Sequence, residues 1–295
     1  MKNNRRSRFC RGILYLTLGT LMVLLVLPEA VQSRTDNTGF SLNAFDGLEN
    51  PQTQTKKGPF GEDPKIIVEP KRIEDLAHTD HIALLKWSME TYQKRVHDYT
   101  GTFLKQERIK GKLKKTEQIA IMFKEKPFSV FMKWEKNAGS GDKMLYVEGS
   151  NNNQMLVHPT GLFSWIKSVK REPRGKDAKK ATLRTCDQFG FYRSMKSLVE
   201  LYETAQKSGD LKTNYIGDTK VDGRPCIAIE RMLPNNNKYP YQRTVVEIDI
   251  EYLLPVKVSM YDWQNQLIGS YVFLNLRFNT GMTNARFTPK ACGLK

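Results

Sequence analysis

Alternation of apolar and polar positions is clearest between residues 116 and 134. In the first half of this stretch, Ile119, Ile121 and Phe123 fall on one face of an extended chain. After a break at residues 124–127 the alternation resumes, and four residues share a face: Phe128, Val130, Met132 and Trp134. A period of two in both segments predicts a β-hairpin. Both strands also carry apolar side chains on their other face, which is typical of a curved sheet with an apolar concave side.

Helical spacing occurs in two segments. After a cap at Thr79 or Asp80, apolar residues recur every three or four positions: Ile82, Leu85, Met89, Tyr92 and Val96. The segment 189–208 has the same spacing and ends before Gly209, with one stripe made of Tyr192, Met195, Val199 and Tyr202. Each stripe predicts an amphipathic helix that packs on a sheet.

Most of the remaining chain alternates like strands. Further strands are predicted at 101–109, 144–148, 154–158, 162–169, 211–221, 225–232, 243–250, 254–262 and 266–278. The Asp222-Gly223 pair predicts a tight hairpin turn. About nine or ten strands with two long helices are enough to bury one substantial core. We therefore predict an α+β fold, with a curved antiparallel sheet wrapped over helices, in one domain over residues 77–295.

The segment before this domain has a different character. Residues 1–33 combine five basic residues, an apolar run from Ile13 to Leu27 and small residues near Ser33, which is the pattern of an export signal cleaved after Ser33. The alternative is an uncleaved anchor, but fifteen apolar residues fall short of the roughly 20 that span a bilayer. Residues 34–76 are polar and lack periodicity, which predicts a disordered tether. We expect a periplasmic or secreted protein.

The chain is strongly basic. Loss of residues 1–33 removes five basic residues and one acidic residue, so the net charge falls from +16 to +12. Outside the cytoplasm, an anionic membrane surface or acidic polymer is the expected partner, and nucleic acid is not. Residues 167–184 hold eight basic and two acidic residues. We predict that this basic loop contacts an anionic surface through Lys170, Arg171, Arg174, Lys179 and Lys180.

Three cysteines follow the export signal: Cys186, Cys226 and Cys292. An odd number allows at most one internal disulfide. In an oxidising compartment we predict a bond between Cys186 and Cys226, and the alternative is three buried thiols.

Motifs for catalysis are not recognisable. The sequence contains no GxSxG, HExxH or phosphate-binding loop, and its four histidines are scattered. Glu247, Asp249 and Glu251 alternate along one strand, as on a solvated face. We predict that the protein is not an enzyme and needs neither metal nor cofactor, although a hydrolase with unrecognised carboxylates remains an alternative.

The predicted strands carry apolar residues on both faces of the sheet, and helices can cover only one of these faces. The space under the helices is then either filled by side chains or left for a ligand. Methionines suit either use, because their side chains adapt to irregular gaps. If a cavity exists, we predict that it is lined by Phe123, Phe128, Phe131, Met132, Trp134, Tyr146, Met260 and Tyr271.

Short segments along the chain carry a family resemblance. They are Phe103-Leu104-Lys105-Gln106-Glu107, Lys126-Pro127-Phe128-Ser129-Val130, Leu145-Tyr146-Val147-Glu148-Gly149, Val221-Asp222-Gly223-Arg224-Pro225-Cys226, Ile248-Asp249 and Leu254-Pro255-Val256. Together with the order of elements, they resemble the LolA/LppX-like family of lipoprotein carriers, and more closely an uncharacterised exported bacterial family, a domain of unknown function. The resemblance implies an unclosed antiparallel barrel over helices, with a hydrophobic cavity that in the carriers accepts acyl chains.

Two functions therefore remain in view. The first is an exported carrier that binds a lipid, an acyl chain or a lipoprotein. The second is a non-catalytic cell-envelope protein with a filled core and a basic interaction surface. The sequence leaves the ligand and the oligomeric state open.

Overall fold

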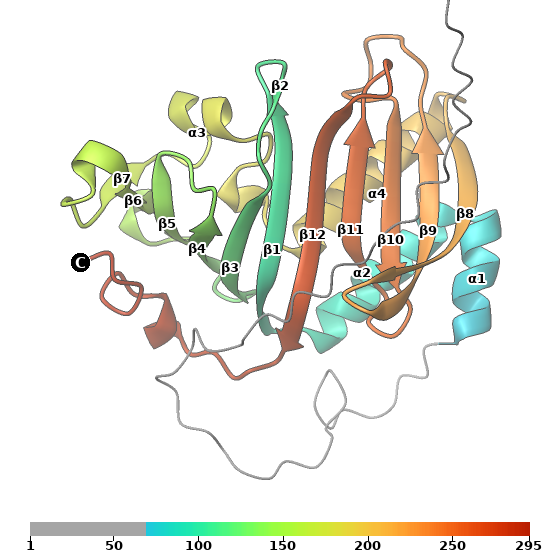
Figure 1. The fold of residues 1–295 in the computed structure, drawn as a ribbon. Helices are drawn as coiled ribbons and strands as arrows, with labels where there is room; N and C mark the ends of the chain where they lie inside the picture. The colour runs from blue at the N-terminus through green and yellow to red at the C-terminus, as the bar shows by residue number, and fades with distance from the viewer. Residues whose placement is uncertain (1–68) are drawn as a thin grey trace, which may run out of the picture. The chain divides into compact units, whose positions relative to one another are not determined.

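The computed structural model describes residues 69–295, which form a single twelve-stranded antiparallel sheet with helices on one side (Figure 1). The strand order is β7-β6-β5-β4-β3-β1-β12-β11-β10-β9-β8, and β2 pairs with β1. The strands are β1 (Asp98–Ile109), β2 (Lys112–Leu113), β3 (Glu117–Lys124), β4 (Ser129–Lys136), β5 (Gly141–Val147), β6 (Met155–Pro159), β7 (Val169–Arg171), β8 (Lys212–Val221), β9 (Arg224–Met232), β10 (Arg243–Asp249), β11 (Leu254–Tyr261) and β12 (Leu267–Phe278). Because β7 and β8 are both edges, the sheet is not closed, and the predicted fold class is confirmed.

The α-helices are α1 (Pro70–Thr79), α2 (His81–Arg95), α3 (Lys176–Ala181) and α4 (Phe191–Lys207). The Asp80 side chain caps α2 by accepting a hydrogen bond from the backbone N of Ala83 at 2.9 Å. Gly190 begins α4 with a φ of 98°, and a Cβ there would lie 2.8 Å from the Phe123 ring. Glycine therefore allows α4 to start directly against the sheet. Within residues 69–295 no helix combines the length and the apolar character that crossing a bilayer requires.

Helix α1 differs from the sequence prediction. We expected a tether through residue 76, but Pro70–Thr79 is helical, and its Ile73 and Ala77 side chains are buried against α2, α4 and the sheet. The spacing of three or four that predicted the long helices occurs here only once, at Ile73, Leu76 and Ala77, which is too short a run to stand out from the polar residues around it. The folded unit therefore begins before residue 77. The predicted export signal and the tether up to residue 68 lie outside the described residues.

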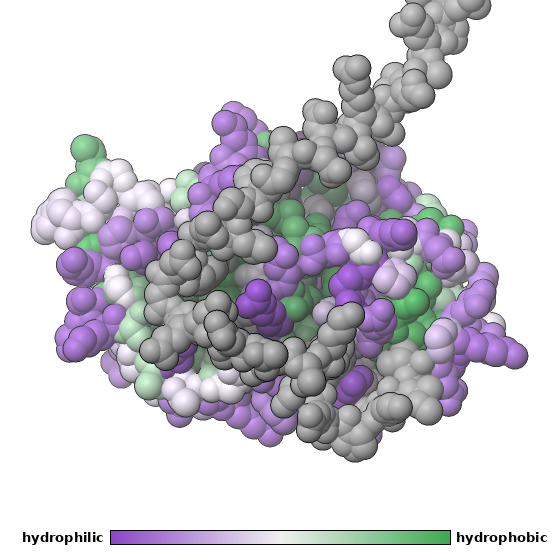
Figure 2. Space-filling view, turned by 60° about the horizontal axis from the view of Figure 1, so that its bottom comes forward, coloured by the Kyte–Doolittle hydropathy of each residue, from purple (hydrophilic) through white to green (hydrophobic). Residues whose placement is uncertain are grey.

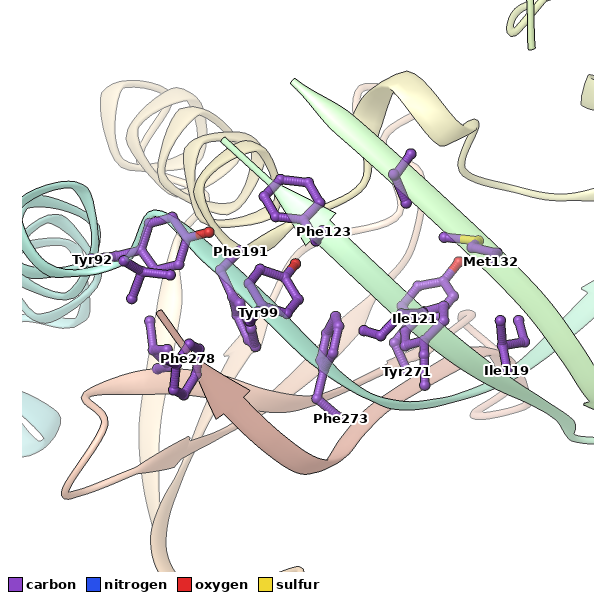
Figure 3. Packing of buried hydrophobic residues seen from close by; sticks show 14 of the residues in the cluster. Tyr92, Tyr99, Ile119, Ile121, Phe123, Met132, Phe191, Tyr271, Phe273 and Phe278 are labelled. Atoms are coloured by element: carbon purple, nitrogen blue, oxygen red, sulfur yellow. The ribbon is translucent and has the colours of Figure 1, made fainter. Parts of the chain in front are cut away.

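The central hairpin forms as predicted. In the pairing of β3 with β4, Ile121 lies opposite Met132, and Phe123 lies opposite Val130. These side chains face the same side of the sheet as the helices and belong to one buried cluster. Figure 3 shows this cluster, in which the Tyr99 ring packs against both Phe123 and Phe191.

The two halves of the sheet are covered differently. Strands β8–β11 pack against α1, α2 and α4, and together they form what we call the helix-covered wing (Figure 1). Strands β1 and β3–β7 form what we call the cavity wing, whose concave face lies under the segment between β7 and α4. The opposite face of the cavity wing is covered by the C-terminal segment, where Met282, Phe287, Cys292 and Leu294 pack on Leu145 and Leu156.

Candidate functional site

The concave face of the cavity wing encloses a cavity of about 700 Å³. Its walls come from β1, β3–β7, β11 and β12, its cover comes from residues 173–191, and Ser194 and Leu198 of α4 also line it. The lining is mainly apolar, and its aromatic and aliphatic members include Phe103, Ile119, Met132, Trp134, Met144, Met155, Val157, Phe163, Phe189, Tyr271 and Phe273. In Figure 3, Ile119, Met132 and Tyr271 lie together at the end of the cluster farthest from Tyr92. A site of this volume and character suits the apolar part of a small ligand.

The cover is fixed to the sheet by one buried carboxylate. Glu107, from β1, is 3% exposed and accepts hydrogen bonds from the Thr182 hydroxyl at 3.1 Å and the backbone N of Leu183 at 3.2 Å. The Tyr271 hydroxyl donates to the same carboxylate at 2.6 Å. Burial, with the adjacent Glu107 charge, raises the pKa of Tyr271 far above its ordinary value, so this hydroxyl stays a hydrogen-bond donor.

A second polar group lies beside the first on the cavity wall. Lys105 Nζ lies 3.1 Å from Glu117 Oε2 and 3.8 Å from Glu107 Oε2. Trp134 Nε1 donates to the same Glu117 oxygen at 2.5 Å. These residues therefore satisfy one another within the wall, which leaves the cavity interior largely apolar.

Cations of the cavity lining on β7 and the cover are less completely paired. Arg171 lies 3.7 Å from Asp177, whereas no described carboxylate lies within ion-pair distance of Lys180 or Arg184. All four residues line the cavity. Lys180 and Arg184 therefore add positive charge to the lining without a paired carboxylate among the described residues, which favours an anionic group. Among residues 69–295, no group of three or more His, Cys, Asp or Glu side chains is arranged to hold a metal ion.

Comparison with known proteins places this chain in a family. Residues 96–292 match the model of the family described as a protein of unknown function (DUF1571). The chain belongs to the DUF1571 family. The match begins after α2, so the first two helices lie outside the family model. No curated protein matches the sequence.

Solved structures match this DUF1571 chain at low identity. A crystal structure of MucB is 15% identical, with a TM-score of 0.43, and the alignment covers 71% of this chain and 62% of MucB. The lipoprotein LppX from Mycobacterium tuberculosis is 14% identical, with coverage of 68% and 96% and a TM-score of 0.39. A LolA superfamily protein from Nitrosomonas europaea is 8% identical, with coverage of 69% and 96% and a TM-score of 0.23.

Of the residues predicted to line a cavity, some line it in this DUF1571 structure, some lie in the filled part of the core, and one lies on the opposite face of the sheet. Met132, Trp134 and Tyr271 line it. Phe123, Phe128, Tyr146 and Met260 belong to the same buried cluster but lie in its filled part.

The prediction for Phe131 is wrong. It packs on the opposite face of the sheet, with Leu145 and the C-terminal segment, because alternate residues of a strand point to opposite faces. The C-terminal segment that covers it has no periodic pattern in the sequence.

The predicted anionic-surface residues also differ in position. Arg171 and Lys180 line the cavity, while Lys170, Arg174 and Lys179 are exposed outside it. Arg174 pairs with Asp187 at 2.6 Å. The basic loop thus supplies both the cover of the cavity and part of the outer surface.

The predicted disulfide is not formed, and Cys186 and Cys226 are both free thiols. Cys186 lines the cavity near Met155, with an Sγ–Sδ distance of 3.7 Å. Cys226 packs with Val221 and Val256, whereas the next residue of β9, Ile227, faces the helices. The two cysteines therefore lie on opposite faces of the sheet, and the sheet itself separates them.

Sequence reasoning missed several lining residues of this DUF1571 chain. Phe103, Lys105 and Glu107 alternate along β1, and all three line the cavity. A lysine and a glutamate that follow a buried phenylalanine on one face were a readable signal of a polar patch beside an apolar wall. Phe189 and Arg184 had no such signal, because the irregular cover positions them.

Proposed function

We propose that this protein is a carrier that shields the acyl part of an anionic amphiphile in the cavity of its cavity wing. The observation that supports this most is an apolar space of about 700 Å³ beside a wing whose core is filled. Burial of about a dozen methylene groups would release roughly 10 kcal/mol before the costs of ordering, at about 0.8 kcal/mol for each group. That is sufficient for retention without a covalent bond.

The charges favour one orientation of the cargo. Lys180 and Arg184 lie on the cover, and the apolar side chains lie on the sheet beneath it. An acyl chain would therefore lie along the sheet, with its carboxylate or phosphate at the cover. Cargo of this kind, with the export pattern of residues 1–33, supports a place in the periplasm or outside the cell.

No catalysis forms part of the proposal. Of the carboxylates that line the cavity, Glu107 and Glu117 accept hydrogen bonds from neighbouring side chains, and Asp177 lies 3.7 Å from Arg171. Shielding requires only that the cover opens and closes. No metal or cofactor is needed.

Native mass spectrometry of the exported protein, purified without detergent, tests the proposal. We expect an added mass that organic extraction identifies as a lipid or a lipid-linked species. A clean unliganded mass, combined with no uptake of offered fatty acid or lysophospholipid, would contradict it.

A pair of neighbouring lysines tests the orientation. Lys180→Glu should weaken binding of an anionic lysophospholipid by roughly fivefold, since a partly exposed charge contributes up to about 1 kcal/mol. Lys179→Glu makes the same charge change on α3 outside the cavity, and it should leave the affinity within about twofold. Equal losses in both variants would mean that only the overall charge matters.

A further inference from the structure

Hydrophobic side chains are concentrated on one loop of the surface. Residues 161–166, which we call the apolar loop, connect β6 to β7. Leu162 is 91% exposed, Phe163 61% and Trp165 77%, and they are three of only five large hydrophobic residues that are exposed among residues 69–295. In Figure 2, hydrophobic residues project at the left, the side on which β6 and β7 lie in Figure 1. Such a concentration marks an interaction site.

The apolar loop has a defined backbone. Gly161–Phe163 form a 3₁₀ turn, and the N–H groups of Ser164 and Ile166 donate to the carbonyls of Gly161 and Phe163 at 3.1 and 3.0 Å. His158 Nε2 lies 3.1 Å from the Ser164 carbonyl oxygen, and its Nδ1 lies 2.5 Å from Asp142. These bonds hold the loop to β5 and β6 while its large side chains face outward.

Positive charge surrounds the apolar loop. Lys167 follows it directly, and Lys170 and Arg171 lie on the edge strand β7 next to it; all three are exposed. Only Arg171 has a described carboxylate near it, at 3.7 Å. An apolar tip that contains tryptophan, with cations behind it, is the pattern that binds the interface of an anionic bilayer.

We propose that the apolar loop inserts Leu162, Phe163 and Trp165 into the interfacial region of an anionic lipid membrane. The acyl region accepts the apolar side chains, and the lipid phosphates pair with the basic residues behind them. A projecting tip suits a deformable bilayer better than the flat surface of a second protein. Phe163 also lines the cavity, so the docked protein would bring the cavity mouth to the membrane. Docking does not depend on the proposed cargo, because the loop lies on the outer surface.

Vesicle binding tests this proposal with the purified exported protein. We expect association with phosphatidylcholine vesicles that contain phosphatidylglycerol, and at least tenfold weaker association with pure phosphatidylcholine. The double variant Leu162→Ser/Trp165→Ser should lose at least tenfold in affinity for the anionic vesicles. Its circular dichroism and thermal midpoint should match the parent, because both side chains are exposed.

The chain offers a matched control at the other end of the sheet. Ile216 is 51% exposed on β8, the opposite edge strand, and Ile216→Ser should leave vesicle binding unchanged. Vesicles that contain lipids with brominated acyl chains should quench the tryptophan fluorescence of the parent protein. Trp165→Phe should remove this quenching and still bind the vesicles.

Three results would overturn the proposal: no association of the parent with anionic vesicles, equal binding by the double serine variant, or loop-dependent self-association in sedimentation velocity without vesicle binding. Loss of vesicle binding with cargo still detected by native mass spectrometry would separate docking from carriage. An unliganded parent that still docks would contradict the carrier proposal alone.

Discussion

The two wings belong to one sheet, but the apolar face of each wing is covered in a different way. In the helix-covered wing, α1, α2 and α4 lie on the strands, and Leu84, Ile229 and Val246 are completely buried. In the cavity wing, the cover is the short helix α3 with irregular chain on either side, and space remains beneath it. Long amphipathic helices present a continuous apolar stripe that interlocks with a sheet, whereas an irregular segment rich in lysine cannot. The comparison teaches that the cavity follows from the poor cover, and not from an unusual sheet.

The first prediction applies one substitution to both wings. Val246 on β10 lies under the helices, and Val157 on β6 lines the cavity. Val246→Asp should reduce the free energy of unfolding by more than about 4 kcal/mol, or prevent folding, because an unpaired carboxylate would be buried without water. Val157→Asp should cost less than about 2 kcal/mol, since Val157 is only half-buried, but it should abolish binding of an acyl ligand.

Urea unfolding followed by circular dichroism measures both costs, and native mass spectrometry measures the cargo. Equal destabilisation of the two variants would show that the cavity wing has a dry, filled core. The alternative function, an envelope protein that acts through its surface, would then be favoured.

The second prediction concerns thiols. Burial, with the adjacent Asp187, raises the pKa of Cys186 to about 12, from an ordinary value of 9.0. At pH 8 its thiolate fraction should be roughly 1000-fold lower than that of an ordinary exposed thiol. Its alkylation should be slower as well, although by a smaller factor, because a thiolate of higher pKa is the stronger nucleophile. Cys226, whose pKa burial raises to about 11, should also react slowly.

Iodoacetamide labelling without reductant, followed by peptide mass mapping, checks this prediction. In urea, Cys186, Cys226 and Cys292 should all be labelled, since each is a free thiol. A Cys186–Cys226 peptide linked by a disulfide would contradict the structure. If the cover opens readily, Cys186 should react faster than Cys226 in the folded protein, and bound lipid should slow it.

Most of the sheet was predictable from the sequence because most neighbouring strands follow one another along the chain. The pairing of β1 with β12 is the exception, and the strand predicted at 162–169 is wrong, because residues 161–166 form the apolar loop and β7 begins only at Val169. Period-two patterns and turn residues such as Asp222-Gly223 act locally, and they specify neighbouring strands without knowledge of the whole fold. The two long helices were predictable for the same reason, since Leu85 and Tyr92 belong to one stripe of regular spacing. Helix α1 was missed, because it is short and only two of its residues are buried.

The site was less predictable because it depends on contacts between distant segments. Alternation assigns Phe131 and Met132 to opposite faces, but it does not reveal which face the C-terminal segment covers. Residues 173–191 lack a period, so the sequence did not show that Lys180 would line a cavity and Lys179 would not. The pairing of Cys186 with Cys226 failed for a related reason: sequence spacing does not show which face of a sheet a cysteine occupies.

The third prediction loosens the cover. Glu107→Ala removes the carboxylate that holds Thr182 and Leu183, and it should raise amide hydrogen exchange in residues 176–189 by roughly 10- to 100-fold, equivalent to about 1–3 kcal/mol. Glu117→Ala is the matched control, because Glu117 also pairs with Lys105 but its hydrogen bond and ion pair go to Trp134 and Lys105 on the sheet. It should leave exchange in this segment unchanged.

A second variant distinguishes release of the cover from general unfolding in this test. Glu107→Gln keeps an oxygen that can accept from Tyr271, so it should preserve the wall while it weakens the cover. If amide exchange in residues 176–189 were the same in the parent and in Glu107→Ala, the hydrogen bonds of Glu107 would not be what holds the cover on the sheet.

The smallest expected effect lies in the helix-covered wing, where His81 connects α1 to α2. Its Nε2–H donates to the carbonyl of Ala77 at 2.8 Å. Burial lowers the pKa of His81 below 6.5, although this hydrogen bond and, to a smaller extent, nearby Asp80 oppose the shift. Between the folded-state pKa and 6.5, the unfolded chain binds more protons than the folded protein, so the free energy of unfolding must fall as the pH drops below about 6.5. His81→Gln retains an amide that can donate to Ala77 but has no proton to gain in this range. Urea unfolding at about pH 7.5 and about pH 5 should therefore show a smaller loss of stability in this variant than in the parent. The cavity wing provides the internal comparison: the loss of stability that Val157→Asp causes at neutral pH should add to that of His81→Gln, since the two sites lie in differently covered halves. An equal pH-dependent loss in the parent and in His81→Gln would show that other groups, and not the packing of α1 on α2, govern the response to acid.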